Sequence, residues 1–104
     1  MKEAYVFVNG TEAGRLCEVH RGRKYKFTYH PWYAGPAVSL TLPVRKGSFV
    51  FHQFPPFFEG LLPEGHQLQG LLRTQRLEKD DYFEQLMAVG HDPLGHVTLL
   101  KIEP

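Results

Sequence analysis

The sequence has little of several features that mark particular classes of protein. Its single cysteine, Cys17, excludes an internal disulfide and fits a reducing compartment. No run approaches the roughly 20 apolar residues of a membrane-spanning helix. The N-terminal "MKEAYVFVNG" has no long apolar stretch of the kind that a signal peptide needs. Together these absences predict a cytoplasmic protein.

An excess of charge of one sign is also missing. The 12 Lys and Arg residues nearly balance the 11 Asp and Glu residues, so the formal net charge is +1. Nucleic-acid-binding domains are usually clearly basic, and the composition gives no general argument for that function. A hydrophobic content of 42% and a charged content of 22% are typical of a globular protein. The length predicts one domain, residues 1–104.

The familiar catalytic motifs are absent as well. There is no G-x-x-x-x-G-K-S/T loop, G-x-G-x-x-G turn, G-x-S-x-G elbow or kinase motif set. The six histidines form no H-E-x-x-H pattern, and His91, Asp92 and His96 are expected to be solvated turn residues rather than metal ligands. Cys17 is expected to be a buried strand residue rather than a nucleophile. We therefore expect no enzymatic activity, no metal and no cofactor.

The first half of the sequence reads as strands. Asn9-Gly10 separates two β-type runs and predicts a hairpin, with the valines of "YVFV" on one face and its aromatics on the other. The run 24–29 alternates aromatic with polar residues, which indicates a strand with one buried face. In "VSLTLPV" the alternation predicts a strand that turns Val38, Leu40 and Leu42 to one side and ends at Pro43.

The second half reads as helices. A short helix is expected within "FPPFFEGLL", and an amphipathic helix from Glu64 to near Leu77. Asp81 and Glu84 stand in capping-box register before a third helix, and Gly90 stands where a C-terminal cap is expected. "HDPLG" predicts a turn and "HVTLLKI" a final strand. The predicted class is α+β: a small antiparallel β-sheet, two or three helices packed on one face, and a C-terminal closing strand.

Two stretches can be interpreted either as purely structural or as surfaces that bind a partner. The basic run of residues 21–26, interleaved with Tyr25, resembles a nucleic-acid-binding strand in miniature. A solvated hairpin turn is the favoured reading, because the whole chain is nearly neutral. Trp32 and Tyr33 fall in a predicted loop, where they either fold over the core or anchor a partner.

The stretch "FFEGLLPEGHQLQGLL" also has two compatible readings. Phe57 and Phe58 are expected to bury against the sheet and to anchor a corner at residues Glu64, Gly65 and His66. An exposed helix start at that corner offers free N–H groups and the positive end of a helix dipole, which suits entry into a cleft on a partner.

Five segments of the sequence carry a further signal, and they read "VFVNGTEAGRL", "YKFTYHPWY", "VSLTLPV", "FFEGLLPEG" and "DDYFEQLMAVGHDPLGHVTLL". The last two match the pattern aromatic-aromatic-x-x-L-L-P-acidic, a hydrophobic helix, then G-x-D-x-x-G-[AH]-V. All five segments occur in the expected order and spacing, and together they extend over nearly the whole chain. The sequence thus resembles the N-terminal subdomain of the HipA family of bacterial serine/threonine kinase toxins.

The resemblance implies a function in protein–protein interaction. In HipA toxins this subdomain continues into a second subdomain and a kinase core, whereas this sequence ends at Pro104, so no kinase activity is expected to carry over. A stand-alone copy resembles HipS, the small component of three-part HipBST toxin–antitoxin systems. There, by resemblance, HipT is the kinase, HipB is the helix-turn-helix DNA-binding protein, and HipS neutralises the kinase.

The resemblance therefore implies an antitoxin that binds a HipT-like kinase, with a HipB-like protein in the same complex and no membrane or direct nucleic-acid partner. Its candidate partner-binding residues are Glu64, Gly65, His66, Trp32, Tyr33, Phe57 and Phe58. Two alternatives stay open at this point. One is a non-catalytic accessory subunit that activates a split kinase, and the other is a nucleic-acid-binding module that uses the "RGRKYKF" face.

Overall fold

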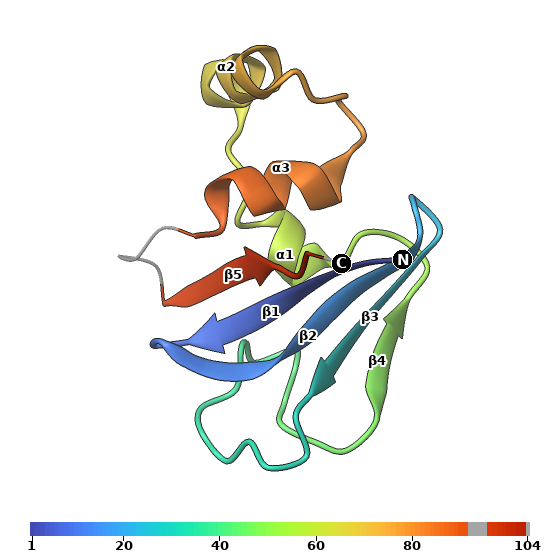
Figure 1. Cartoon of the computed structure of the whole chain (residues 1–104), viewed down its shortest axis with the longest axis vertical. Coiled ribbons are helices and arrows are strands. Elements are labelled where there is room, and N and C mark those ends of the chain that lie inside the picture. Colours follow the sequence, from blue (N-terminus) through green and yellow to red (C-terminus); the bar gives the residue numbers. More distant parts are fainter. Residues whose placement is uncertain (92–95, 104) are drawn as a thin grey trace.

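The computed structural model describes residues 1–91 and 96–103, which form one five-stranded antiparallel sheet and three helices (Figure 1). The elements are β1 (Lys2–Val8), β2 (Thr11–His20), β3 (Lys24–Tyr29), β4 (Ser48–Phe51), α1 (Pro56–Glu59), α2 (Gly65–Gln75), α3 (Tyr82–Val89) and β5 (Val97–Lys101). The strand order is β4-β3-β2-β1-β5, so the last strand pairs with the first. The predicted α+β class with a closing strand is confirmed.

The predicted hairpin at Asn9-Gly10 is also confirmed. Both residues have positive φ, 49° and 83°, which is the geometry of the two-residue turns that match the twist of paired strands. Because side chains alternate across a strand, Val6 and Val8 are buried while Tyr5 and Phe7 are half-exposed on the other face. None of the described helices is long and apolar enough to cross a bilayer.

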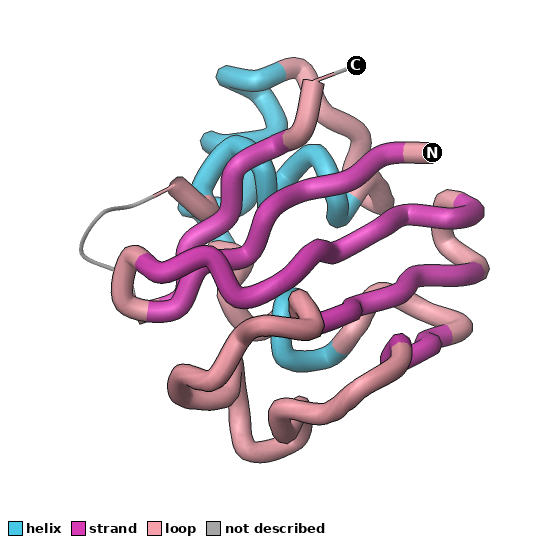
Figure 2. The backbone as a smooth tube through the Cα atoms, turned by 60° about the horizontal axis from the view of Figure 1, so that its bottom comes forward, coloured by secondary structure: helices cyan, strands magenta, loops and turns pink. Residues whose placement is uncertain are grey.

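The core lies between the inner face of the sheet and helices α1 and α3. Tyr25, Phe27 and Tyr29 of β3 point into it, as their alternation predicts. The ring of Phe27 lies 5.8 Å from that of Phe58 in α1. The strands fan out into one twisted sheet, and the long connection between β3 and β4 lies at one edge of it (Figure 2).

The strand predicted across residues 38–42 is wrong. Leu42 N–H donates to the Ser39 carbonyl at 3.1 Å, which closes a tight turn in place of a strand. Tyr29 Oη accepts from Val38 N–H at 2.8 Å and donates to the Leu42 carbonyl, so both ends of the turn are held against β3. Val38 and Leu42 are therefore buried, whereas Leu40 at the tip is 102% exposed.

Strand β4 has no counterpart among the predicted elements. Its four residues pair with β3 in the register Phe27↔Phe49 and Tyr25↔Phe51. Four residues are too short for a clear alternation, and pairing with β3 makes this segment a strand.

The third helix starts and ends where the sequence predicts. The Asp81 side chain accepts from Glu84 N–H at 3.4 Å. The Glu84 carboxylate, however, accepts from Lys101 Nζ on β5 at 2.6 Å, so its side chain also links α3 to the sheet. Gly90 caps the helix with φ −73°, an ordinary helical value, and donates to Leu86 O at 2.6 Å. Most of the predicted "HDPLG" turn lies outside the described residues.

Candidate partner-binding site

The corner formed by Glu64, Gly65 and His66 is exposed at the start of α2. Glu64 is in an extended conformation (φ −127°, ψ 163°), and its side chain makes no capping hydrogen bond to the described helix. Gly65 has φ +60°, a value that L side chains rarely adopt, so glycine is favoured at this bend. The corner thus presents a sharp turn, a carboxylate, an imidazole and the uncapped N–H groups of a helix start.

Helix α1 fixes the corner to the core. Phe58 is 0% exposed, whereas Phe57 is half-buried with its ring 5.2 Å from that of Phe58. Leu61 N–H donates to Phe58 O and Leu62 N–H to Glu59 O, at 3.1 and 3.0 Å. The chain therefore leaves the buried aromatic pair in a defined direction.

Helix α2 stands away from the sheet, with α3 lying between them (Figure 1). None of its eleven residues, all of which the structure describes, is fully buried. Leu68, Leu71 and Leu72 are half-exposed, so the apolar stripe that predicts this helix is only partly covered. The helix ends at Arg76 in a left-handed conformation (φ 55°), and Leu77 N–H donates back to Leu72 O.

A groove of about 310 Å³ runs between the corner, α1 and α3. Leu62, Pro63, Leu68 and Tyr82 contribute to its walls. Gln85 also lines it and is 0% exposed; its amide Nε2 donates to the carbonyls of residues 78 and 79 at 2.9 and 3.0 Å. This bond pair holds the chain between α2 and α3 in place beside the groove.

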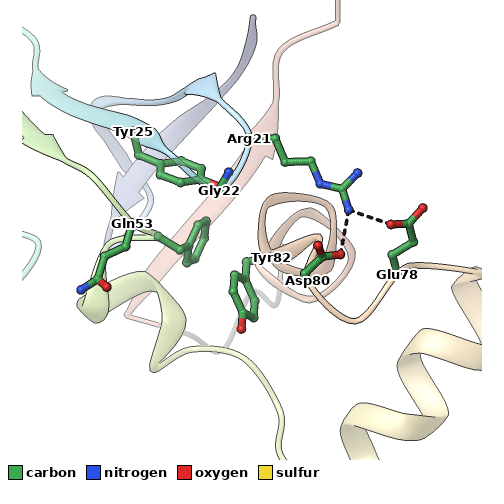
Figure 3. Close-up of a pocket in the computed structure, with 8 residues that line it drawn as sticks. Arg21, Gly22, Tyr25, Gln53, Glu78, Asp80 and Tyr82 are labelled. Atoms are coloured by element: carbon green, nitrogen blue, oxygen red, sulfur yellow. Dashed lines mark hydrogen bonds and ion pairs between the residues drawn. The ribbon is translucent and has the colours of Figure 1, made fainter.

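An ion-pair cluster ties the same connection to the β2–β3 turn. One guanidinium nitrogen of Arg21, Nη2, lies 3.0 Å from Glu78 and 2.9 Å from Asp80 (Figure 3). Tyr25 and Tyr82 line the pocket beside this cluster. All three ion-pair partners are well exposed, so salt screens the pairs. Arg21 therefore has acidic partners within its own chain.

The two loop aromatics behave differently. Trp32 is 64% exposed and stacks on the ring of His30 at 4.7 Å. Tyr33 is 6% exposed, stacks on Tyr29 at 5.7 Å and donates from its hydroxyl to Pro36 O at 2.6 Å. Of the pair, Trp32 is the one that presents its side chain to solvent.

The single cysteine lies on the outer face of the sheet and is half-buried. Cys17 lies in a strand, as expected, but the expectation that it is buried is wrong, because its position in β2 turns it away from the helices. Burial, with the hydrogen bond to Glu3 and the charge of that carboxylate, raises the pKa of its thiol to about 11. A thiol that stays protonated at neutral pH is a poor nucleophile.

His91, Asp92 and His96 are the residues that the sequence offers as conceivable metal ligands. Within residues 1–91 and 96–103, no group of three or more His, Cys, Asp and Glu side chains is placed to hold a metal ion. Asp92, one of the three residues considered as ligands from the sequence, lies outside the described residues. The candidate site built by the described residues consists of an exposed corner, a half-covered helix and a groove.

The model of the HipA N-terminal domain family matches residues 4–100. The chain belongs to this family. A solved structure of the N-terminal domain of HipA toxin is similar in fold, with a TM-score of 0.76 and 30% sequence identity. The match covers 99% of this chain and 94% of the other. The HipA N-terminal domain thus accounts for almost every described residue, and the family places the chain in the context of toxin–antitoxin systems.

An uncharacterized protein of Haemophilus influenzae is a further relative. It is 33% identical over 99 residues, which make up 95% of this chain and 92% of that protein. The similarity between the two proteins therefore extends over most of both chains.

The sequence predicted the exposed corner and the burial of Phe58, whereas Phe57, also expected to bury against the sheet, is only half-buried. The sequence missed the groove and the ion pairs of Arg21. Both depend on contacts between residues that lie far apart in the chain. The separation of Arg21 from Asp80 is 59 positions, and no local pattern signals a pairing at that distance. The one usable signal was the run of acidic residues between α2 and α3, which a basic turn can neutralise.

Proposed function

We propose that this HipA N-terminal domain acts as a non-enzymatic antitoxin, comparable to HipS. It binds a separate HipT-like serine/threonine kinase and neutralises it, in a cytoplasmic complex that also contains a HipB-like helix-turn-helix DNA-binding protein. Residues 1–104 act as one domain, without a cofactor, and any effect on transcription is indirect. Membership in the HipA N-terminal domain family is the observation that carries this proposal.

The shape of the molecule supports a contact through the corner and α2. An amphipathic helix normally covers its apolar stripe. Here Leu68, Leu71 and Leu72 remain half-exposed, so a surface on a partner protein completes their burial. The buried anchor Phe58 keeps the corner rigid, which lowers the entropic cost of binding.

Two routes to inhibition fit this surface. In the first, the His66 side chain enters the kinase active site and occludes it. In the second, the domain binds the inactive arrangement of the kinase more tightly than the active one and shifts the population toward it. Trp32 is the second candidate for the intruding side chain, because it is exposed on a loop. Tyr33 and Phe58 support these surfaces from the core.

Co-expression with a HipA-like kinase encoded beside this protein tests the proposal. The wild-type protein is expected to restore growth, lower kinase autophosphorylation and co-purify with the kinase. A charge placed on the exposed stripe, Leu71→Lys, is expected to weaken co-purification. His66→Ala is expected to weaken inhibition by about tenfold or more if that side chain is an interface anchor.

His20→Ala serves as the matched control, since His20 is an exposed histidine at the far end of β2. It is expected to inhibit as the wild type does. If the wild-type protein neither co-purifies with the kinase nor alters its turnover, the antitoxin proposal fails. If the protein raises kinase turnover, the chain is instead an activating subunit of a split kinase.

A further inference from the structure

The sheet has two edges, and only one of them is protected. At the β5 edge, Leu99 N–H donates to Gly90 O at 2.7 Å, and the strand ends on Lys101. At the β4 edge, no other described segment pairs with the strand on its outer side. Alternate residues of an antiparallel edge strand direct their N–H and C=O groups away from the sheet. Natural edge strands usually carry Lys, Pro or a bulge that blocks pairing, and the sequence "SFVF" of β4 has no Lys and no Pro.

Apolar surface surrounds the open edge. A pocket of about 150 Å³ borders β4 at Phe51 and is walled by Leu42 and by residues 55–57. Val50 is 47% exposed on the outer face of β4. Leu40 projects fully into solvent next to Thr41, which also lines the pocket. A fully exposed leucine and a half-exposed valine beside unpaired backbone groups mark an interaction surface.

The charge of the surrounding chain is one-sided. Residues 19–58, which include β3, β4 and the connection between them, contain six Lys and Arg residues and no Asp or Glu. All eleven acidic residues lie outside this segment. Arg21 is paired with Glu78 and Asp80, and Arg23 lies beside it in the β2–β3 turn. The other four basic residues of this segment lie on β3 or just before β4. The chain as a whole is nearly neutral, but residues 19–58, which contain β4, are clearly basic.

We propose that the β4 edge binds an extended segment of another protein, rich in Asp or Glu and carrying apolar side chains. The segment adds to the sheet as a sixth strand beside β4. Its backbone pairs with the outward N–H and C=O groups of residues 48–51, and one apolar side chain enters the pocket at Phe51. Its carboxylates face the basic residues Lys26, Arg45 and Lys46. Phe57 lines this pocket, but residues 48–51 are not part of the corner at residues 64–66, so the proposal goes beyond the proposed function.

The same observations disfavour other occupants. A second copy of this chain, paired through β4, would bring two basic halves together, and like charges across a strand pair destabilise it. A nucleic acid would satisfy the positive charges but would leave the apolar pocket and the outward carbonyl groups of β4 without partners. An acidic extended peptide satisfies the backbone groups, the pocket and the charge together.

Backbone NMR of the full chain tests the proposal directly. The probe is a short peptide, acetylated and amidated, in which valine alternates with glutamate. At millimolar concentration it is expected to shift the amide signals of residues 48–51 and to slow their hydrogen exchange. Val50→Glu places a negative charge on the edge and is expected to weaken this binding by about two- to tenfold, as one or two unfavourable cross-strand charge pairs would.

Leu100→Glu is the matched control, because Leu100 is exposed on the protected edge strand β5 to a similar degree, 56%. It is expected to leave peptide binding unchanged, and the remaining amide signals report that each variant is folded. The proposal is overturned if the glutamate peptide leaves residues 48–51 unperturbed. It is equally overturned if a valine–lysine peptide binds as well, if a DNA or RNA oligonucleotide shifts these amides instead, or if the free chain dimerises through β4.

Discussion

Two phenylalanines that are adjacent in the chain have different roles in the molecule. Phe58 is fully enclosed and lies against Phe27 of the sheet, while Phe57 is half-buried and lines the pocket beside β4. In an α-helix neighbouring side chains point about 100° apart, so only one of the two can face the core. Phe58 therefore contributes mainly to stability, and Phe57 contributes to an accessible surface.

Replacing Phe58 with alanine is expected to lower the free energy of unfolding by about 3–5 kcal/mol, because it removes a buried ring and leaves a cavity. Phe57→Ala is expected to cost clearly less, since much of that ring is already in water. Chemical denaturation of the two variants measures the difference. Equal losses would mean that the assignment of Phe58 as the anchor of the corner is mistaken.

Glu84 connects α3 to two strands. Burial by itself would raise the pKa of its carboxyl, but the hydrogen bond from Lys101 and the charges of Lys2 and Lys101 outweigh it and hold the pKa below 4.5. A group whose pKa is lower in the folded than in the unfolded state stabilises the fold when it is ionised. That contribution is complete above the ordinary value of 4.5 and disappears as the pH falls through the lowered pKa.

Glu84→Gln is accordingly expected to lower stability at neutral pH by about 1 kcal/mol, a typical value for a partly exposed ion pair. The wild-type protein should lose this advantage as the pH falls below 4.5, so that the two unfolding curves converge in acid. Thermal unfolding followed between neutral and acidic pH provides the measurement. A constant difference across that range would rule out an ionic role for this carboxylate.

At the scale of elements, two glycines illustrate how packing decides what a position tolerates. Gly90 closes α3, and a Cβ there would lie 2.7 Å from Leu86 O and 3.0 Å from Leu99 Cδ1. Gly70 lies in the middle of α2, and a Cβ there would meet no described atom within 4 Å apart from its chain neighbours and the helix's own backbone. The first glycine allows a helix to approach a strand, whereas the second only weakens its helix.

Alanine substitutions at the two positions are therefore expected to have opposite signs. Gly90→Ala should destabilise the protein by about 1–3 kcal/mol, through overpacking between α3 and β5. Gly70→Ala should stabilise α2 by up to about 1 kcal/mol, because alanine is the better helix former. Circular dichroism during urea denaturation distinguishes the two. Stabilisation by both substitutions would show that the α3–β5 junction has room to relax.

At the scale of the whole molecule, the apolar contacts are distributed unevenly. The sheet and the inner faces of α1 and α3 hold most of the buried core, with further residues from the connections on either side of β4. Helix α2 lies beyond α3 without a fully buried residue among those described. The connection after α2 is held by the bonds of Gln85 and by the exposed ion pairs of Arg21. Segments with few buried apolar contacts open with less free energy than the global unfolding reaction.

Native-state hydrogen exchange is expected to reflect this distribution. Amides of α2 should exchange much faster than those of β1 and β2, and Arg21→Ala should speed exchange around residues 78–81 without changing the sheet. High salt should mimic that substitution in the wild-type protein, because the ion pairs are exposed. If α2 exchanged only as slowly as the central strands, the helix would be part of the cooperative core.

The predictions from the sequence succeeded where a local rule applied and failed where pairing across the chain decided. Alternation identified β1 and β3, and the Asp81 cap identified α3. The same alternation misassigned residues 38–42, because two hydrogen bonds with Tyr29 stabilise a turn there. Strand β4 was missed, since it exists only by its pairing with β3.

The candidate site was predictable to a similar extent. The corner at residues 64–66 followed from a proline, a glycine and the start of a helical pattern, all of them adjacent. That Tyr33 is enclosed while Trp32 is exposed did not follow, because both have the same loop signature. Only the position of the loop against Tyr29 separates them.

The sequence by itself determined the elements with a clear period or a defined turn, the absence of the familiar catalytic motifs, and the resemblance to HipA N-terminal domains. The tertiary structure alone decided which edge of the sheet stays open, how the acidic connection after α2 meets Arg21, and which aromatic side chains reach solvent. The physical reason is the distance along the chain over which each effect acts. Backbone propensity and side-chain periodicity depend on a few consecutive residues. Strand pairing, burial and charge neutralisation depend on residues that are far apart in the sequence and meet only in the folded chain.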